Sequence, residues 1–181
     1  MQYQKYIFDE LQAALEKVDP QEILTLREEL MRSSTIFCDG LGRSGLQARA
    51  FSMRMMHLGL SSAVIGDVLA PPVSDSAILV ICSGSGESET LLGRARRAKA
   101  LGAKLAAVTA EKGSTLAQLS HITIELNAPL KEQRRERHSI QPMGTLFEQA
   151  AGLFFDMLVL ELMDAMKVTN AEMVLRHANV E

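Results

Sequence analysis

Hydroxyl side chains are concentrated in one short glycine-rich segment, Ser83-Gly-Ser-Gly-Glu-Ser88. Three serines within six residues, set among glycines that let the backbone turn tightly, can surround a phosphate group with hydroxyl and N–H donors. A second glycine-rich segment, residues 38–45, contains Arg43 and Ser44. Each segment stands between an apolar run and a helical pattern, so the positive end of a helix dipole points at it. Together the two segments predict a binding site for a phosphorylated small molecule.

Glu148 is the carboxylate best placed to move protons. It lies near the start of a long helical pattern whose other members are apolar: Met143, Leu146, Phe147, Ala150 and Ala151. A carboxyl group among apolar neighbours holds a proton more readily than one in water, which suits a base that must return the proton it has taken. The alternative is a first-turn acid that the helix dipole stabilises. We expect Glu148 to be a catalytic base.

His57 and His177 are candidates for proton transfer in the same reaction, because histidine exchanges protons near neutral pH. His57 follows Ser44 by thirteen residues of one helix, a distance of about 20 Å at 1.5 Å per residue. If it acts, we therefore expect it to act in the site of a neighbouring subunit. The alternative for His57 is a buried structural role. His121 and His138 are expected to be structural or solvated.

Apolar runs alternate with helical patterns along most of the chain, which is typical of a parallel sheet with right-handed crossovers. Strands are expected at 35–38, 62–65, 76–82, 104–109 and 121–126. Helices are expected at 45–58, from the serine-containing segment 83–88 to 101, at 114–119, at 142–167 and from a capping box at Thr169. These elements predict an α/β domain over 34–181, a five-stranded parallel sheet between helices in a flavodoxin-like three-layer sandwich.

Residues 1–33 form an N-terminal arm of two predicted helices, the second starting at Asp19-Pro20. The arm is too short for an independent domain and is expected to pack on the core or on a partner subunit. The mixed-charge run 131–138 is interpreted as a solvated segment, with a lid or a subunit contact as the alternative.

Composition narrows the class of partner. A net charge of −3 argues against non-specific binding to nucleic acid. Cys38 and Cys82 end apolar runs and are expected to be buried, reduced thiols, and no Cys-x-x-Cys or His-x-x-x-His spacing indicates a metal site or a cofactor. The apolar runs are too short for a membrane span, and the first residues do not resemble a signal peptide. We expect a cytoplasmic protein.

Gly40-Leu-Gly42-Arg-Ser-Gly45 matches the dinucleotide-binding pattern, with Asp67 near the position of a ribose-binding acid. The short second strand, however, runs directly into Gly66-Asp67 and two prolines, which leaves little room for an adenosine pocket. The hydroxyl cluster at 83–88 suits a terminal phosphate better than a nicotinamide. We therefore do not expect a dinucleotide cofactor.

These motifs resemble the sugar isomerase (SIS) domain superfamily, whose sugar-phosphate loop is similar to residues 83–88, with serine at 88 where many members have threonine. Within it, the chain is similar to the 6-phospho-3-hexuloisomerase branch through Gly42-Arg-Ser-Gly45, Phe51-Ser-Met-Arg-Met-Met-His-Leu-Gly59, Gln141-Pro-Met-Gly-Thr-Leu-Phe-Glu148 and Arg176-His-Ala178. That branch interconverts D-arabino-3-hexulose 6-phosphate and D-fructose 6-phosphate through an enediol, in the ribulose monophosphate pathway of formaldehyde fixation.

The resemblance implies roles for individual residues. Ser44, Ser83, Ser85 and Ser88 would hold the phosphate, with helix capping as the alternative for Ser83 and Ser88. Gly42, Arg43 and Gly84 would contact the substrate, with a surface ion pair as the alternative for Arg43. Glu148 would be the enolising base, and His57 or His177 would open the sugar ring. The resemblance also implies a homotetramer with sites at subunit interfaces.

Two other functions fit the same motifs. One is an aldose–ketose isomerase of another sugar phosphate, which would use the same chemistry between C1 and C2. The other is a non-catalytic sugar-phosphate sensor, because SIS domains also occur in transcriptional regulators. The 33 residues before the sheet are too few and too acidic to supply a DNA-binding module.

Overall fold

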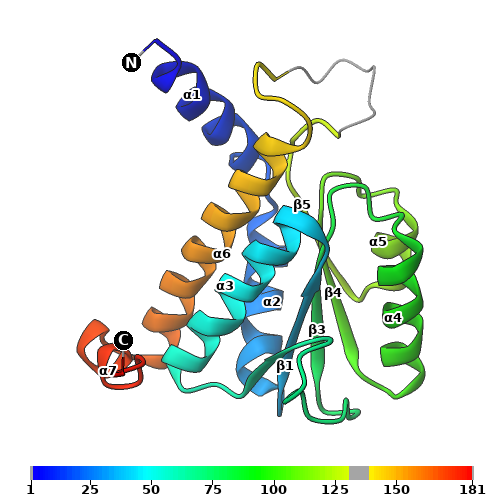
Figure 1. Cartoon of the computed structure of the whole chain (residues 1–181), viewed down its shortest axis with the longest axis vertical. Helices are drawn as coiled ribbons and strands as arrows, with labels where there is room; N and C mark the ends of the chain where they lie inside the picture. Colours follow the sequence, from blue (N-terminus) through cyan, green and yellow to red (C-terminus); the bar gives the residue numbers. More distant parts are fainter. Residues whose placement is uncertain (1, 131–138, 181) are drawn as a thin grey trace.

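The computed structural model describes residues 2–130 and 139–180, so the charged run 131–138 lies outside the described residues. Five parallel strands form one sheet in the order β2-β1-β3-β4-β5 (Figure 1). Their bounds are β1 Ile36–Gly40, β2 Ser62–Val64, β3 Ile78–Cys82, β4 Lys104–Thr109 and β5 Ile122–Glu125. The predicted five-stranded parallel sheet is therefore confirmed.

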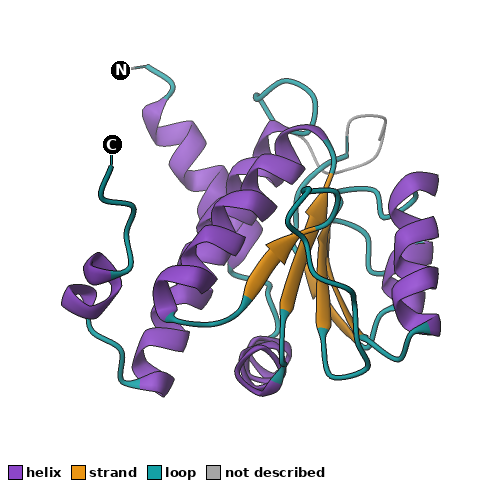
Figure 2. Cartoon of the chain, turned by 60° about the horizontal axis from the view of Figure 1, so that its bottom comes forward, coloured by secondary structure: helices purple, strands orange, loops and turns teal. Residues whose placement is uncertain are grey.

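Helices cover both faces of the sheet, which gives three layers (Figures 1 and 2). One face carries α1 (Gln4–Leu15), α2 (Pro20–Arg32), α3 (Gly42–Leu58) and α6 (Thr145–Met166); the other carries α4 (Glu89–Ala100) and α5 (Thr115–Leu119). A short helix, α7 (Asn170–Leu175), follows α6 and packs on α3. The order and layers are those of the predicted α/β sandwich.

The central strand β3 explains why the sheet needs both layers. All five of its residues are buried, and it pairs with β1 on one side and β4 on the other. Val80 and Cys82 face the α3–α6 side, whereas Leu79 and Ile81 face α4, as expected when side chains alternate along a strand. A continuous apolar strand is stable only when helices cover both faces.

Two helix starts differ from the sequence prediction by three residues each. Helix α3 begins at Gly42, whose φ of +57° lets the chain turn directly from β1 into the helix, so Arg43 and Ser44 lie on its first turn. Helix α6 begins at Thr145 and not at Pro142, because Met143 has a φ of +57° and so cannot be part of a right-handed helix. The predicted caps Asp19 and Thr169 are confirmed: the former accepts from Gln21 N, and the latter forms a complete capping box.

The N-terminal arm packs within its own chain. Leu11, Ala14, Leu26 and Leu30 are buried in the core cluster that includes α6 and β5. Cys38 and Cys82 are buried free thiols, as predicted. Among the described residues, no helix has both the length and the apolar composition to cross a bilayer.

Candidate active site

The two serine-containing segments meet at the carboxyl edge of the sheet, where they line a cavity of about 620 Å³. Ser44, Ser83, Gly84, Ser85, Ser88 and Glu148, six of the residues selected from the sequence, belong to its lining. The remaining wall consists of Leu41, Cys82, Glu87, Leu91, Pro129, Leu130, Gly144 and Phe147. This volume is in the range of small-molecule sites.

The segment 83–88 is held as a compact turn by its own hydroxyls. Ser83 Oγ accepts a hydrogen bond from Gly86 N (3.3 Å), and Ser85 Oγ accepts one from Glu87 N (3.3 Å). Gly86 has a φ of +64°, and a Cβ atom there would overlap Ser114 Oγ. The turn therefore requires glycine at 86, and it keeps the serine hydroxyls on the cavity wall.

Ser88 occupies the N-cap position of α4, but none of that helix's described backbone N–H groups donates to its hydroxyl. The capping alternative for this serine is thus not realised by a side-chain hydrogen bond. The hydroxyl remains at the cavity beside the N terminus of α4, where the helix dipole favours an anion.

The glycine-rich segment 38–45 brings Ser44 to the same cavity. A Cβ atom on Gly45 would lie 2.5 Å from the Gly40 carbonyl oxygen, so only glycine lets α3 start this close to β1. Ser44 and Cys82, the last residue of β3, both line the cavity. Gly42 and Arg43 are outside the cavity lining, and Arg43 reaches the site through its side chain.

Glu148 lies in the first turn of α6 and is only 6% exposed. Its Oε2 is 3.2 Å from Arg43 Nη1, and the same nitrogen donates to Thr145 Oγ1 at 3.2 Å. Burial, and next the negative charge of Glu148, raise the pKa of the Cys82 thiol to about 12. The structure thus places one carboxylate, paired with a cation, in the wall that also carries the serines.

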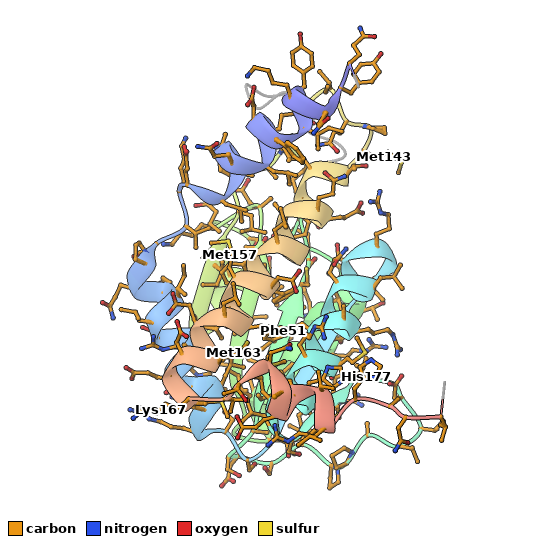
Figure 3. All side chains as sticks on the ribbon, turned by 90° about the vertical axis from the view of Figure 1, so that its left-hand side faces the viewer. Phe51, Met143, Met157, Met163, Lys167 and His177 are labelled. Carbon is orange, nitrogen blue, oxygen red and sulfur yellow. The ribbon has the colours of Figure 1, made fainter. Side chains whose placement is uncertain are left out.

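His57 and His177 lie together, away from this cavity. Their rings stack with centroids 5.3 Å apart, His57 is 3% exposed, and Arg176 Nη1 donates to the His57 carbonyl at 3.0 Å. His57 lies in the last turn of α3, the helix whose first turn contains Ser44. Figure 3 shows Met143, just before α6, in the upper part of the molecule and His177 in the lower part. Burial, Arg54 and His177 lower the pKa of His57.

Sequence reasoning missed parts of the site. Glu87 lines the cavity and accepts from Thr115 N at 2.7 Å; its place inside the serine motif was a usable signal. Leu130 and Phe147 form an apolar wall against Gly84, where a Cβ atom would meet them at 3.4 and 3.2 Å. No pattern marks Leu130, because it belongs to an irregular connection.

The ion pair of the buried Asp39 with the partly exposed Arg94 was also missed. Asp39, at the end of β1, is buried and receives both of its ion-pair hydrogen bonds from Arg94 Nη1, at 2.8 and 3.1 Å. Burial raises the pKa of Asp39 despite Arg94.

Asp67, the acid of the dinucleotide-binding pattern, forms two hydrogen bonds with the guanidinium of Arg49. Within the described residues, no three His, Cys, Asp or Glu side chains are grouped as metal ligands would be.

Comparison with known proteins gives the family. The SIS domain model matches residues 29–153. The chain is 35% identical to a 3-hexulose-6-phosphate isomerase of Bacillus subtilis, over 99% of this chain and 98% of that one. It is also 35% identical to a 3-hexulose-6-phosphate isomerase of Mycobacterium gastri, over 96% and 87% of the two chains.

A crystal structure from Methanococcus jannaschii, for which a 3-hexulose-6-phosphate isomerase function was inferred, superposes with a TM-score of 0.88. The two sequences are 27% identical, and the match covers the whole of both chains. The chain therefore belongs to the SIS domain family, in the group that contains these 3-hexulose-6-phosphate isomerases.

Proposed function

We propose that this protein interconverts D-arabino-3-hexulose 6-phosphate and D-fructose 6-phosphate, as a cytoplasmic enzyme of the ribulose monophosphate pathway. The observation that carries the proposal is the position of Glu148, a buried carboxylate in the same cavity wall as four serines. Family membership supports a sugar-phosphate isomerase, and the names of the relatives support this particular substrate pair.

The phosphate is assigned to the segment 83–88 together with Ser44. Hydroxyl and N–H donors at the N terminus of α4 bind a dianion without a buried cation, so the product can leave after each turnover. The phosphate end then fixes the sugar carbons in the remaining part of the cavity, beside Glu148 and below Leu130 and Phe147.

Glu148 is assigned as the base. It removes the proton from C2 of the 3-ketose, the C–H electron pair forms the C2=C3 double bond, and the C3 oxygen takes up a proton. The resulting enediol loses the proton of its C2 hydroxyl, the carbonyl forms at C2, and C3 receives the proton held by the carboxyl group. The reaction therefore requires a base that reaches both C2 and C3, and a group that moves protons between the C2 and C3 oxygens.

Arg43 is assigned two tasks, holding Glu148 in the free protein and contacting the substrate when it is bound. The guanidinium is 55% exposed, so water screens the pair and little free energy is needed to open it. It lies on the first turn of α3, next to Ser44, within reach of the same cavity wall.

The histidine pair is assigned to the site of a neighbouring subunit. His57 and His177 stack at the end of α3 opposite to Ser44, so they do not serve the cavity of their own chain. Exposed apolar side chains on α3 and α6 support an oligomer: Leu46, Met53, Met56, Leu153, Met157 and Leu160 (Met157 in Figure 3). We propose a homotetramer in which the pair opens the sugar ring.

Proton NMR of fructose 6-phosphate with the protein in D₂O tests the reaction. Deuterium at C3 and a new 3-ketose signal are expected, and Glu148→Gln is expected to remove both. Deuterium at C1 would instead identify an aldose–ketose isomerase. Binding without exchange at either position would identify a sensor, and the proposed function would be wrong in both cases.

A further inference from the structure

Helix α1 holds both ends of the long connection between β5 and α6. At the first end, Asn127 N donates to the Ala14 carbonyl at 3.0 Å. At the second end, the Glu10 carboxylate accepts from Ser139 Oγ (2.7 Å), Ile140 N (2.9 Å) and Gln141 Nε2 (3.0 Å). One carboxylate of the N-terminal arm thus binds three consecutive residues that are about 130 positions away in the sequence.

The connection held in this way is part of the cavity wall. Pro129 and Leu130 follow Asn127 directly and line the cavity, and so does Gly144, just before α6. Only Pro142, Met143 and Gly144 separate the segment bound by Glu10 from the first residue of α6. The segment bound by Glu10 therefore lies directly before α6, the helix whose first turn carries Glu148.

Helix α1 is itself packed into the hydrophobic core. Leu11 and Ala14, on the turn next to Glu10, are buried in the core cluster together with residues of α6. Figures 1 and 3 both show α1 beside the start of α6. Burial acts to raise the pKa of Glu10, but the hydrogen bonds from Gln141, Ser139 and Ile140 together lower it, so the group is a carboxylate at neutral pH.

We propose that Glu10 is a positioning residue of the sugar-phosphate site: it anchors 139–141 and thereby sets the cavity wall and the start of the helix that carries Glu148. The proposal rests on the proposed function for the identity of the ligand. It gives the N-terminal arm a task within its own chain, because the arm fixes the site without touching the substrate.

Glu10→Ala and Glu10→Gln test this role, with Asp9→Ala as the matched control. Asp9 lies on the same helix, and its exposed side chain is paired with Lys5. The alanine variant is expected to raise the dissociation constant for fructose 6-phosphate about tenfold, because the cavity wall loses its anchor, and to lower kcat about tenfold, because the start of the helix that carries Glu148 is no longer fixed. The glutamine variant keeps an acceptor and is expected to raise the dissociation constant about threefold, and Asp9→Ala to change it less than twofold.

Hydrogen exchange supplies a second readout that needs no turnover. Amides of 139–148 are expected to exchange faster in Glu10→Ala than in the wild type, with the rest of α6 unchanged. Unchanged exchange in this segment, or faster exchange with unaltered affinity, would overturn the proposal. If the wild type does not bind fructose 6-phosphate, the proposed function fails, and affinity is then measured for inorganic phosphate, where an unaltered value in Glu10→Ala overturns the positioning role.

Discussion

The hydroxyl of Ser83 has two roles: it closes the turn at 83–88, and we assign it to the phosphate. Its hydroxyl oxygen accepts from Gly86 N, so its proton is free to point at a ligand in the cavity. A hydroxyl that both shapes an anion site and donates to the anion affects affinity more than turnover.

Ser83→Ala is therefore expected to raise KM for fructose 6-phosphate about tenfold and to leave kcat within about threefold, since the lost interaction is present before and during the reaction. Inhibition by inorganic phosphate should weaken to a similar extent. Ser74→Ala, at an exposed serine before β3, is the control and should change neither constant. A fall confined to kcat would assign Ser83 to the chemical step instead.

The serines and Glu148 were predictable because each belongs to a local pattern, a glycine-rich turn or an apolar helical stripe. Glu10 and Asp39 were not. Their partners, 139–141 and Arg94, are distant in sequence, and a single carboxylate carries no mark of the contacts it will make. Local patterns identify groups that line the cavity, but they do not identify carboxylates such as Glu10 and Asp39, whose partners are far away in the sequence.

At the scale of elements, the strands were predicted closely because continuous apolar runs have few alternatives. Residues 104–109 form β4 as expected. Helix starts were less accurate where the backbone enters the left-handed region. Nothing in the pattern indicates that Met143 has a φ of +57° or that Gly42 begins a helix at that angle.

Two glycine substitutions, one before α4 and one within it, test the turn at 83–88. Gly86→Ala is expected to destabilise the protein by about 1–3 kcal/mol, because of its positive φ and the overlap with Ser114. Gly93→Ala, in the middle of α4 with nothing within 4 Å of the added carbon, is expected to stabilise it by about 1 kcal/mol. Urea unfolding measures both, and equal effects would show that the turn does not depend on glycine at 86.

The contact between α3 and α7 is expected to depend on pH. His57 has a pKa below the ordinary 6.5, owing to burial, Arg54 and His177, so below that pH the unfolded chain binds more protons than the folded one. The contribution of His57 to folding stability is therefore fully present above pH 6.5, and it decreases as the pH falls from 6.5 through the lowered pKa of the folded protein. The guanidinium groups of Arg54 and Arg176 lie beside His57, and neither of these cations favours protonation of its ring.

The variant His57→Gln tests whether His57 causes this pH dependence of stability. Urea midpoints are measured at pH 7.5 and 5.5 for both proteins. The wild type should lose more stability over this interval than the variant, because the variant lacks the group that takes up the proton on unfolding. Equal losses would mean that other groups account for the pH dependence.

At the scale of the whole molecule, one chain carries the cavity and the histidine pair at opposite ends of α3. The cavity with Glu148 lies at the carboxyl edge of the sheet, and the histidine pair lies at the far end of α3. A 17-residue helix spans about 25 Å, so the two groups of residues cannot meet on one substrate in one chain. In a symmetric oligomer, each cavity can instead face the histidine pair of another subunit.

Mixing two inactive variants tests this arrangement. One chain carries Glu148→Gln, and the other carries His57→Gln with His177→Asn; each alone is expected to be inactive. After unfolding and refolding together in equal amounts, about a quarter of the sites should combine an intact Glu148 with an intact histidine pair, and about a quarter of wild-type activity should return. If both groups acted within one chain, every hybrid would lack one of them and no activity would return. If the doubly substituted chain alone were fully active, the histidines would have no part in the reaction.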